Sequence, residues 1–407
     1  MENGQPASYA AASRTLFIAV AAIGFAQTVL FAILAPLGRE IGLAEIQVGA
    51  IISASSLTIF LTSPWWGRTS DTHGRKKILL IGLFGYSVGT AIFAAVFQAA
   101  LLGLLVPLAA FIGLTVARIG NATVMAAVMP AANAYMADIT SVATRTRGMA
   151  ALGAAGNIGS MLGPAIGGLL TSITLLTPLY FSVLLTLGAA VLALFALPER
   201  AAAKITHKPA KLRYSDPRIL PFVIVGTCLF MGFALVQQTI AFRFQDVLQL
   251  TTAETAKVTG ISMMLSAAAS LFAQMFVIPR LAVSPVSLLR IAMPIMIIAF
   301  VTMAVSVTQV PLTFAMVMLG LGLGFAAPGF MAGASLAVSA DEQGGVAGVA
   351  ASCPPLGFTF GPLIGTLLYS YDPTYPYWFA AIIYVGLTVF MWNLARKLKA
   401  VSDGLAE

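Results

Sequence analysis

The sequence predicts an all-α membrane protein of twelve transmembrane helices in two pseudo-symmetric six-helix bundles. Three observations support this fold class. Hydrophobic residues make up 59% of the 407 residues and charged residues only 9%, which leaves too little polar surface for a water-soluble globule. Apolar runs recur at about 20 residues, the length with which a helix crosses the hydrocarbon core. The runs are continuous and not alternating, which excludes a transmembrane β-barrel.

The apolar runs fall into two groups of six. The first spans lie near residues 15–37, 46–66, 77–100, 108–137, 146–171 and 175–197. The second lie near 218–243, 255–279, 286–307, 311–338, 344–370 and 374–395. The expected domains are therefore an N-terminal bundle (1–197), a cytoplasmic linker (198–217) and a C-terminal bundle (218–407). The polar start lacks the features of a removable signal peptide, so the first span is expected to serve as its own insertion signal.

The positions of the charges predict the orientation. With both termini and the linker inside, 18 of the 22 lysines and arginines lie on the cytoplasmic side. Only Arg39, Arg243 and Lys257 then lie outside, and Arg118 falls within a span. The net charge of +8 is explained by this topology, so it does not indicate nucleic-acid binding.

An internal repeat relates the two halves. The pattern G-x3-G-P-x2-G occurs in the fifth and eleventh spans at an offset of 198 residues, and Pro130 and Pro328 obey the same offset. Small residues on one helix face let backbones approach closely, while prolines permit bending. We expect close packing, a gating movement, or both from the motif residues Gly159, Gly163, Pro164, Gly167, Gly357, Gly361, Pro362 and Gly365.

The connection between the second and third spans carries a family motif. Residues 66–77 read W-G-R-T-S-D-T-H-G-R-K-K and resemble the signature loop of the major facilitator superfamily. Arg118 occupies the place of that family's fourth-helix arginine, and Asp138 followed by Arg145 matches the end of that helix and the next loop. The run from Gly159 to Gly168 is similar to the fifth-helix motif of the 12-helix drug:proton antiporters. The resemblance covers the whole chain and implies a monomeric secondary transporter of a bacterial inner membrane.

The signature loop is expected to form a conformational latch. Gly67 and Gly74 would allow a tight turn between two helix ends. Asp71 would then accept hydrogen bonds from a helix N-terminus and pair with Arg145 or Arg147. The alternative is a simple positive-inside anchor, although an anchor needs no aspartate. The latch residues are Gly67, Asp71, Gly74, Arg75, Asp138, Arg145 and Arg147.

Arg118 is the charged residue placed deepest in a span. A charge there costs several kcal/mol unless it faces a polar cavity or a partner. Roughly 20 residues at about 1.5 Å each separate it from Asp138, which puts it in the outer half of the membrane. We expect it to serve substrate binding or coupling. The alternatives are that its side chain snorkels outward or that it is a structural pin that hydrogen-bonds to first-span carbonyls.

The other intramembrane polar residues are neutral. None of the 14 acidic residues falls in the middle third of a span, so proton coupling is left open. Arg243 and Asp246 are expected to form an ion pair at the outer surface. An unpaired amide facing lipid would be costly, so the amides are favoured as site residues. With Arg118, the expected substrate or coupling residues are Gln27, Phe31, Asn121, Met125, Asn157, Gln237, Gln238, Gln274 and Phe358.

Two transport functions fit these features. The first is efflux of a small amphipathic organic molecule by alternating access, as in multidrug resistance, with protons as the candidate coupling ion. The second is a carrier for an anionic metabolite, siderophore or lipid-like molecule, with Arg118 as counter-charge. An enzyme is disfavoured because no catalytic or metal-ligand cluster is visible, and no cofactor or metal is expected.

Cys228 and Cys353 lie in apolar runs and are expected to be small buried residues.

Overall fold

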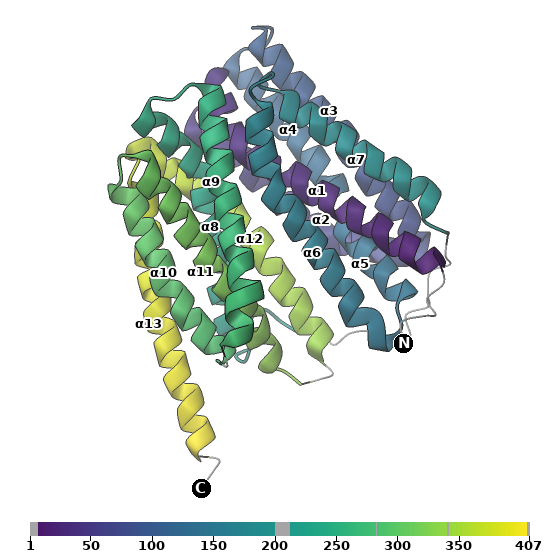
Figure 1. Ribbon diagram of the computed structural model, residues 1–407, viewed down its shortest axis with the longest axis vertical. Helices are drawn as coiled ribbons and strands as arrows, with labels where there is room; N and C mark the ends of the chain where they lie inside the picture. Colours follow the sequence, from purple (N-terminus) through teal and green to yellow (C-terminus); the bar gives the residue numbers. More distant parts are fainter. Residues whose placement is uncertain (1–6, 200–211, 282, 340–341, 405–407) are drawn as a thin grey trace. The chain divides into compact units, whose positions relative to one another are not determined.

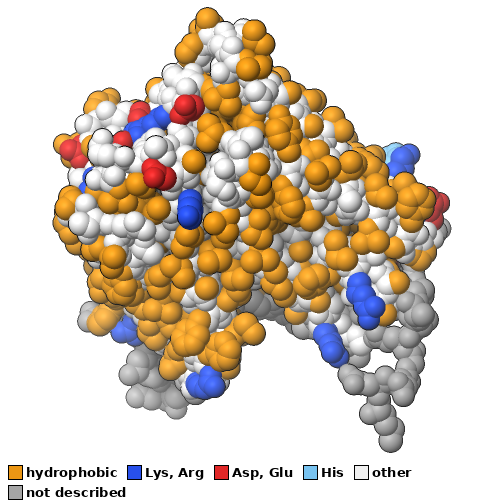
Figure 2. Space-filling view, turned by 45° about the horizontal axis from the view of Figure 1, so that its top comes forward, with side chains coloured by type: hydrophobic (Ala, Val, Ile, Leu, Met, Phe, Trp, Pro, Cys, Tyr) orange, Lys and Arg blue, Asp and Glu red, His pale blue; other side chains and the backbone are white. Residues whose placement is uncertain are grey.

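The computed structural model describes residues 7–199, 212–281, 283–339 and 342–404, and within these ranges it is built from helices without strands (Figure 1). Twelve stretches of helix in the described chain are long and apolar enough to cross a membrane. Hydrophobic side chains cover most of the face shown in Figure 2. The predicted all-α fold with twelve spans is confirmed.

The helices follow the predicted spans closely. The first half contains α1 (Ala7–Glu40), α2 (Glu45–His73), α3 (Arg75–Leu101), α4 (Pro107–Met125), α5 (Val128–Ile139), α6 (Val142–Leu170) and α7 (Thr177–Ala196). The second half contains α8 (Leu220–Leu248), α9 (Thr252–Phe272), the short turns η1 (Ala273–Val277) and η2 (Ile278–Arg280), α10 (Pro285–Val305), α11 (Gln309–Leu336), α12 (Gln343–Tyr371) and α13 (Tyr375–Gly404). Much of the predicted linker, residues 200–211, and both chain ends lie outside the described residues.

One predicted span consists of two helices. The sequence predicted a single helix near 108–137, but α4 ends at Met125 and α5 begins at Val128. Pro130 has no N–H to donate to the carbonyl of Ala126, so the helical hydrogen-bond ladder is interrupted at this point. The two helices still form one membrane span, Pro107–Ile139. Pro328 occupies the corresponding place in α11, which continues through it.

The chain divides into two compact units. Unit 1 comprises residues 1–206 and 250–261, and unit 2 comprises residues 207–249 and 262–407. Within unit 1, α1 packs on α6, and α3 packs on α4 and α7. Within unit 2, α8 packs on α12, and α10 packs on α11 and α13. Corresponding helices therefore pair in the same way in both units, as a duplicated six-helix element predicts.

The repeated glycine motif makes close helix contacts in each unit. A Cβ atom on Gly159 of α6 would overlap the carbonyl oxygen of Ala21 in α1. A Cβ atom on Gly361 of α12 would lie 2.5 Å from the carbonyl oxygen of Met231 in α8. Only glycine leaves room for such an approach, so both helix pairs pack backbone to backbone. The close packing that the motif favours is therefore present in both units.

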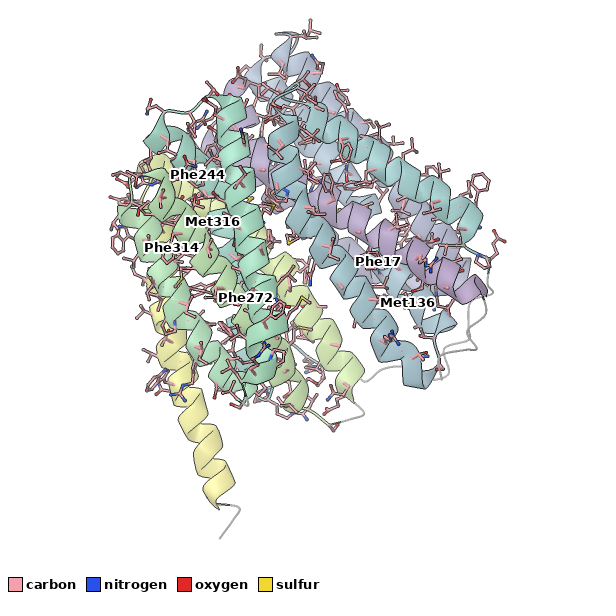
Figure 3. All side chains as sticks on the ribbon, viewed as in Figure 1. Phe17, Met136, Phe244, Phe272, Phe314 and Met316 are labelled. Carbon is pink, nitrogen blue, oxygen red and sulfur yellow. The ribbon has the colours of Figure 1, made fainter. Side chains whose placement is uncertain are left out.

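Large apolar side chains lie both inside the helix packing and on its surface (Figure 3). Met136 of α5, Phe244 of α8 and Met316 of α11 are buried. Phe272 of α9 and Phe314 of α11 are 55% and 54% exposed. Many helices expose large apolar residues in this way, which would favour aggregation in water but suits contact with lipid.

Candidate functional site

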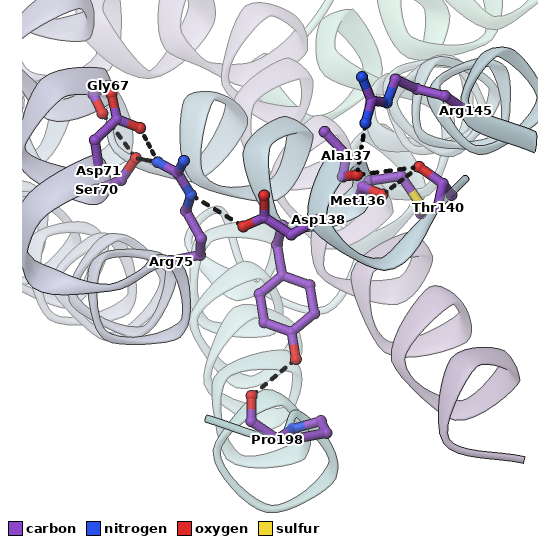
Figure 4. Close-up of polar contacts among 11 residues, drawn as sticks. Gly67, Ser70, Asp71, Arg75, Met136, Ala137, Asp138, Thr140, Arg145 and Pro198 are labelled. Carbon is purple, nitrogen blue, oxygen red and sulfur yellow. Dashed lines mark hydrogen bonds and ion pairs between the residues drawn. The ribbon is translucent and has the colours of Figure 1, made fainter. Parts of the chain in front are cut away.

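A charged network joins the end of α2, the start of α3 and the end of α5 (Figure 4). Gly74 separates α2 from α3 with a φ of +95°, a conformation that favours glycine. The turn places Arg75 at the start of α3, with its side chain only 7% exposed. Its guanidinium pairs with Asp71, donates to the Ser70 hydroxyl at 3.0 Å, and donates through Nε to Oδ2 of Asp138 at 3.3 Å. One arginine therefore connects three segments of unit 1.

The sequence predicted the wrong partner for Asp71. The sequence favoured Arg145 or Arg147, but the carboxylate pairs with Arg75, four residues along the chain. Arg145 instead donates to the backbone carbonyl of Ala137 at 3.3 Å, and Arg147 is exposed. The sharp turn at residue 74 brings Arg75 back toward the last turn of α2, so no residue from α6 is needed to neutralise Asp71.

Gly67 does not form the turn that was expected of it. It lies inside α2, and a Cβ atom there would sit at an ordinary 3.9 Å from Pro130 of α5. Beside it, the indole N–H of Trp66 donates to the carbonyl of Thr123 in α4 at 2.5 Å. The tight turn depends on Gly74, while this part of α2 packs on the break between α4 and α5.

Arg118 lies in α4 against α3. It is 5% exposed and lies close to the hydroxyl of Tyr86 in α3. Its Nε is buried without a hydrogen-bond partner, and none of the ion pairs among the described residues includes it. The neighbour of Arg118 is thus a neutral phenol on α3. Among the described residues Arg118 makes no hydrogen bond to a carbonyl of α1, so the pin that was the alternative is not formed.

Asn121 extends this polar group by one helical turn. Its Nδ2 donates to the hydroxyl of Thr90 at 2.9 Å and to the carbonyl of Tyr86 at 3.4 Å, while its Oδ1 is buried without a partner. Gly89 permits the approach, because a Cβ atom there would lie 2.9 Å from that of Asn121. Met125 follows on α4 and is buried. Sequence reasoning missed Tyr86 and Thr90, since such residues are common in apolar spans and no spacing marks them.

The other candidates of unit 1 lie on a different pair of helices. Gln27 and Phe31 belong to α1, where Phe31 is buried and Gln27 is half-buried. Asn157 belongs to α6 and is exposed. The structure thus groups the expected unit 1 residues into an α3–α4 set around Arg118 and an α1–α6 set.

The candidates of unit 2 include an unusual pair of glutamines on α8. Gln238 is fully buried, and neither atom of its amide has a hydrogen-bond partner. The Oε1 atom of Gln237 is also buried without a partner. Phe358 of α12 packs against Phe233 of α8 with 6.3 Å between ring centroids. This part of unit 2 therefore combines unsatisfied amides with an aromatic surface.

Gln274 lies on a separate segment of unit 2. It belongs to η1, a π-helical turn between α9 and Pro279. Its amide donates to the hydroxyl of Ser270 at 3.2 Å. Wide turns of this kind are rare and occur often at functional sites, but here Gln274 has a partner on its own helix.

Arg243 and Asp246 do not form the surface ion pair that was expected. Arg243 is 7% exposed and donates to the carbonyls of Ala304 and Ser306, at 3.2 and 3.0 Å, where α10 ends. Asp246 accepts a hydrogen bond of 2.7 Å from the hydroxyl of Tyr369 in α12. Terminal carbonyls lack partners within their own helix, so a guanidinium is stable there. These contacts bind α8 to α10 and α12.

The described residues contain no group of three or more His, Cys, Asp or Glu that could hold a metal ion. Cys228 is half-buried and Cys353 is buried, and both are free thiols. The polar groups around Arg118, Asn121 and Gln238 are arginine and amide groups, which suit hydrogen bonding to a ligand better than metal coordination.

Comparison with known proteins gives matches along most of the chain. A family model described as Major Facilitator Superfamily matches residues 16–353. Multidrug resistance protein 1 of Bacillus subtilis (strain 168) is 27% identical over 398 residues, which cover 95% of this chain and 96% of that protein. The class G tetracycline resistance protein of Vibrio anguillarum is 30% identical over 339 residues, covering 79% of this chain and 80% of that protein.

Solved structures share the fold at low sequence identity. A bacterial homologue of the human lysosomal transporter Spinster, in an inward-facing and occupied conformation, matches with a TM-score of 0.73 and 15% identity, covering 97% of this chain and 98% of that one. The human organic anion transporter MFSD10 (TETRAN) matches with a TM-score of 0.65 and 19% identity, covering 95% and 100%. At these identities the likeness establishes the architecture and nothing finer.

Proposed function

Because this chain belongs to the major facilitator superfamily, we propose that it exports a small amphipathic organic molecule across the membrane by alternating access. Its relatives are transport proteins, so it is a transporter of small molecules and not an enzyme. The finer assignment, efflux, is carried by the similarity to a multidrug resistance protein over 95% of the chain. The tetracycline resistance protein supports the same direction of transport.

Buried polar atoms without partners support a ligand site in each unit. Among the described residues with such atoms are Arg118 and Asn121 in unit 1 and Gln237 and Gln238 in unit 2. Such atoms are costly in a membrane protein unless a substrate or water pairs with them for part of the cycle. The 17 methionines and 25 phenylalanines suit an adaptable apolar wall around them. The remaining proposed substrate residues are Gln27, Phe31, Met125, Asn157, Gln274 and Phe358.

The network around Arg75 supports a conformational latch. Asp71, Arg75 and Asp138 hold three helix ends together through charge-assisted hydrogen bonds that can form in one state and break in another. We place this latch, both termini and the 198–217 linker on the cytoplasmic side of a bacterial inner membrane, because 18 of 22 basic residues then lie inside. In this cycle a monomer would suffice, with α6 and α12 as gating helices.

The function is tested by transport into and out of proteoliposomes. We would load vesicles with amphipathic dyes of three kinds, cationic ethidium, neutral N-phenylnaphthylamine and anionic dansylglycine, with and without an imposed pH gradient. The proposal expects protein-dependent movement of at least one dye. Movement that responds to the gradient would identify protons as the coupling ion. Absence of protein-dependent flux for every dye would contradict the assignment to multidrug-type export.

A further inference from the structure

The described chain buries three arginines, and their surroundings differ. Arg75, Arg118 and Arg243 are 6%, 5% and 7% exposed. Arg75 pairs with two carboxylates, and Arg243 donates to two backbone carbonyls at a helix end. Arg118 alone among the three has neither a carboxylate nor a backbone carbonyl as partner and lies beside the neutral phenol of Tyr86; its Nε is unsatisfied, as is that of Arg243. A buried guanidinium in a membrane span needs a compensating negative group, and the described part of unit 1 supplies none.

Arg118 lies too far from the ends of its own span for an acidic side chain there to neutralise its charge. Arg118 lies 11 residues after Pro107 and 21 before Ile139 in the span Pro107–Ile139. At about 1.5 Å per residue these separations are roughly 16 Å and 31 Å. Asp138, the acidic residue of this span, already pairs with Arg75 at the far end. The charge on Arg118 therefore lies well away from the acidic side chains at the helix termini.

The neighbouring polar groups are suited to hold a ligand beside the guanidinium. Tyr86 and Thr90 present hydroxyls from α3, and Asn121 presents an unpaired amide oxygen one helical turn from Arg118. A guanidinium binds the planar carboxylate group well through parallel N–H donors. The free amide oxygen accepts a hydrogen bond, so it favours a ligand with an N–H or O–H donor near its carboxylate.

We propose that Arg118, together with Tyr86, Thr90 and Asn121, binds the anionic group of the transported molecule, which is an organic carboxylate with a nearby hydrogen-bond donor. This inference rests on the proposed transport function and names its substrate class. Arg118 supplies the charge with Tyr86 beside it, Thr90 positions Asn121, and Asn121 accepts from the neighbouring donor. The carboxylate of the substrate would then neutralise the buried charge, which has no acidic partner among the described residues.

A pair of probes that differ in one charge tests the proposal. Dansylglycine carries a carboxylate next to a sulfonamide N–H, and dansylglycinamide is its neutral counterpart. Binding of each to the full-length protein in nanodiscs would be measured by dansyl fluorescence at neutral pH in methanesulfonate buffer. We expect the wild type to bind the carboxylate roughly tenfold more tightly or better, and Arg118→Gln to lose this preference. Arg118→Lys should retain part of it, because the charge remains without the planar fork.

Matched arginine variants serve as controls. Arg243→Gln alters another buried arginine of a span, and Arg280→Gln alters an exposed one; both should keep the preference for the carboxylate. Thermal unfolding with benzoate or benzamide gives a second readout, in which benzoate should stabilise the wild type but not Arg118→Gln. No binding of either probe to the wild type, equal affinity for both, or an unchanged preference in Arg118→Gln would overturn the proposal.

Two further experiments are needed. One distinguishes an inorganic from an organic anion as the ligand, and the other distinguishes failure of the anion site from failure of the export function. Strong competition by chloride in place of methanesulfonate would assign the site to an inorganic anion, and no competition would assign it to an organic carboxylate. If dansylglycine binds through Arg118 but no dye is transported, the export function fails while the anion site stands. If the amide and the acid are transported equally well, export stands and the anion site fails.

Discussion

Arg75 links three segments because the five N–H donors of a guanidinium spread in one plane. Ser70 and Asp71 receive hydrogen bonds from Nη1, and Asp138 receives one from Nε. A lysine at this position has a single ammonium group and could not reach all three at once. At this scale the signature loop is therefore a set of defined pairs and not merely a positively charged stretch.

Replacing Asp71 by asparagine tests whether these pairs act in transport. We expect transport to fall by roughly tenfold, the effect of about 1.4 kcal/mol on one state of the cycle, while membrane expression stays near wild type. Arg75 keeps Asp138 as a partner, so the fold should survive. Dye flux in proteoliposomes, normalised to reconstituted protein, gives the measurement.

The matched control is Glu45→Gln. Glu45 also pairs with an arginine, Arg39, at 2.7 Å, but at the junction of α1 and α2. It should transport normally because this pair lies outside the network around Arg75. If Asp71→Asn transports as well as this control, the loop is only a positive-inside anchor.

Arg118 gives a second test at the scale of one residue. Arg118→Ala should reduce transport by roughly tenfold or more, and Arg118→Lys should recover little of it, because a point charge lacks the planar donor fork. The fold should survive, since alanine removes an uncompensated charge and strands no carboxylate. Substrate flux and size-exclusion profiles of both variants are the measurements. Normal flux in Arg118→Ala would make this residue dispensable for transport.

The helix contacts of α6 and α12 depend on which face each glycine occupies. Gly159 and Gly361 face the backbone of a neighbouring helix. Gly153 and Gly348 belong to the same two helices, and a Cβ atom on either would meet nothing within 4 Å. Two glycines of one helix thus have different roles, although the sequence shows both only as small residues in an apolar run.

Alanine substitutions at these positions should separate the two roles. Gly159→Ala and Gly361→Ala should each destabilise the protein by about 1–3 kcal/mol, because the added methyl group forces the paired helices apart. Gly153→Ala and Gly348→Ala should be neutral or slightly stabilising, since alanine favours the helix. Thermal unfolding in one detergent allows all four to be compared. Equal stability across the four variants would show that the close approach is not required.

The topology of the whole molecule follows from charge and is tested by labelling. In a background with Cys228 and Cys353 replaced, single cysteines at Glu2, Lys208 and Glu407 should react only with permeant maleimides in intact cells. A cysteine at Leu104, in the exposed connection between α3 and α4, should react with impermeant maleimide. Labelling of any of the first three by the impermeant reagent would reverse the predicted orientation.

For the molecule as a whole, the sequence alone was sufficient for the all-α class, the twelve spans and the family, because the length and apolarity of a span are local properties imposed by lipid. It also marked the glycine motif and the isolated charge of Arg118. It did not give the break at Pro130, where a missing N–H divides one span into two helices while Pro328 leaves α11 continuous.

Only the tertiary structure decided which side chains meet. A helix that is apolar on all sides gives no pattern to fix its rotation about its axis, so a residue's neighbours on other helices cannot be found from periodicity. This explains why the burial of Arg243 against the end of α10 and the approach of Tyr86 to Arg118 escaped prediction. The pairing of Asp71 with Arg75 depends instead on the backbone turn at Gly74. Local solvent preference fixes the spans, whereas side-chain partners depend on helix rotation and packing, which are properties of the assembled bundle.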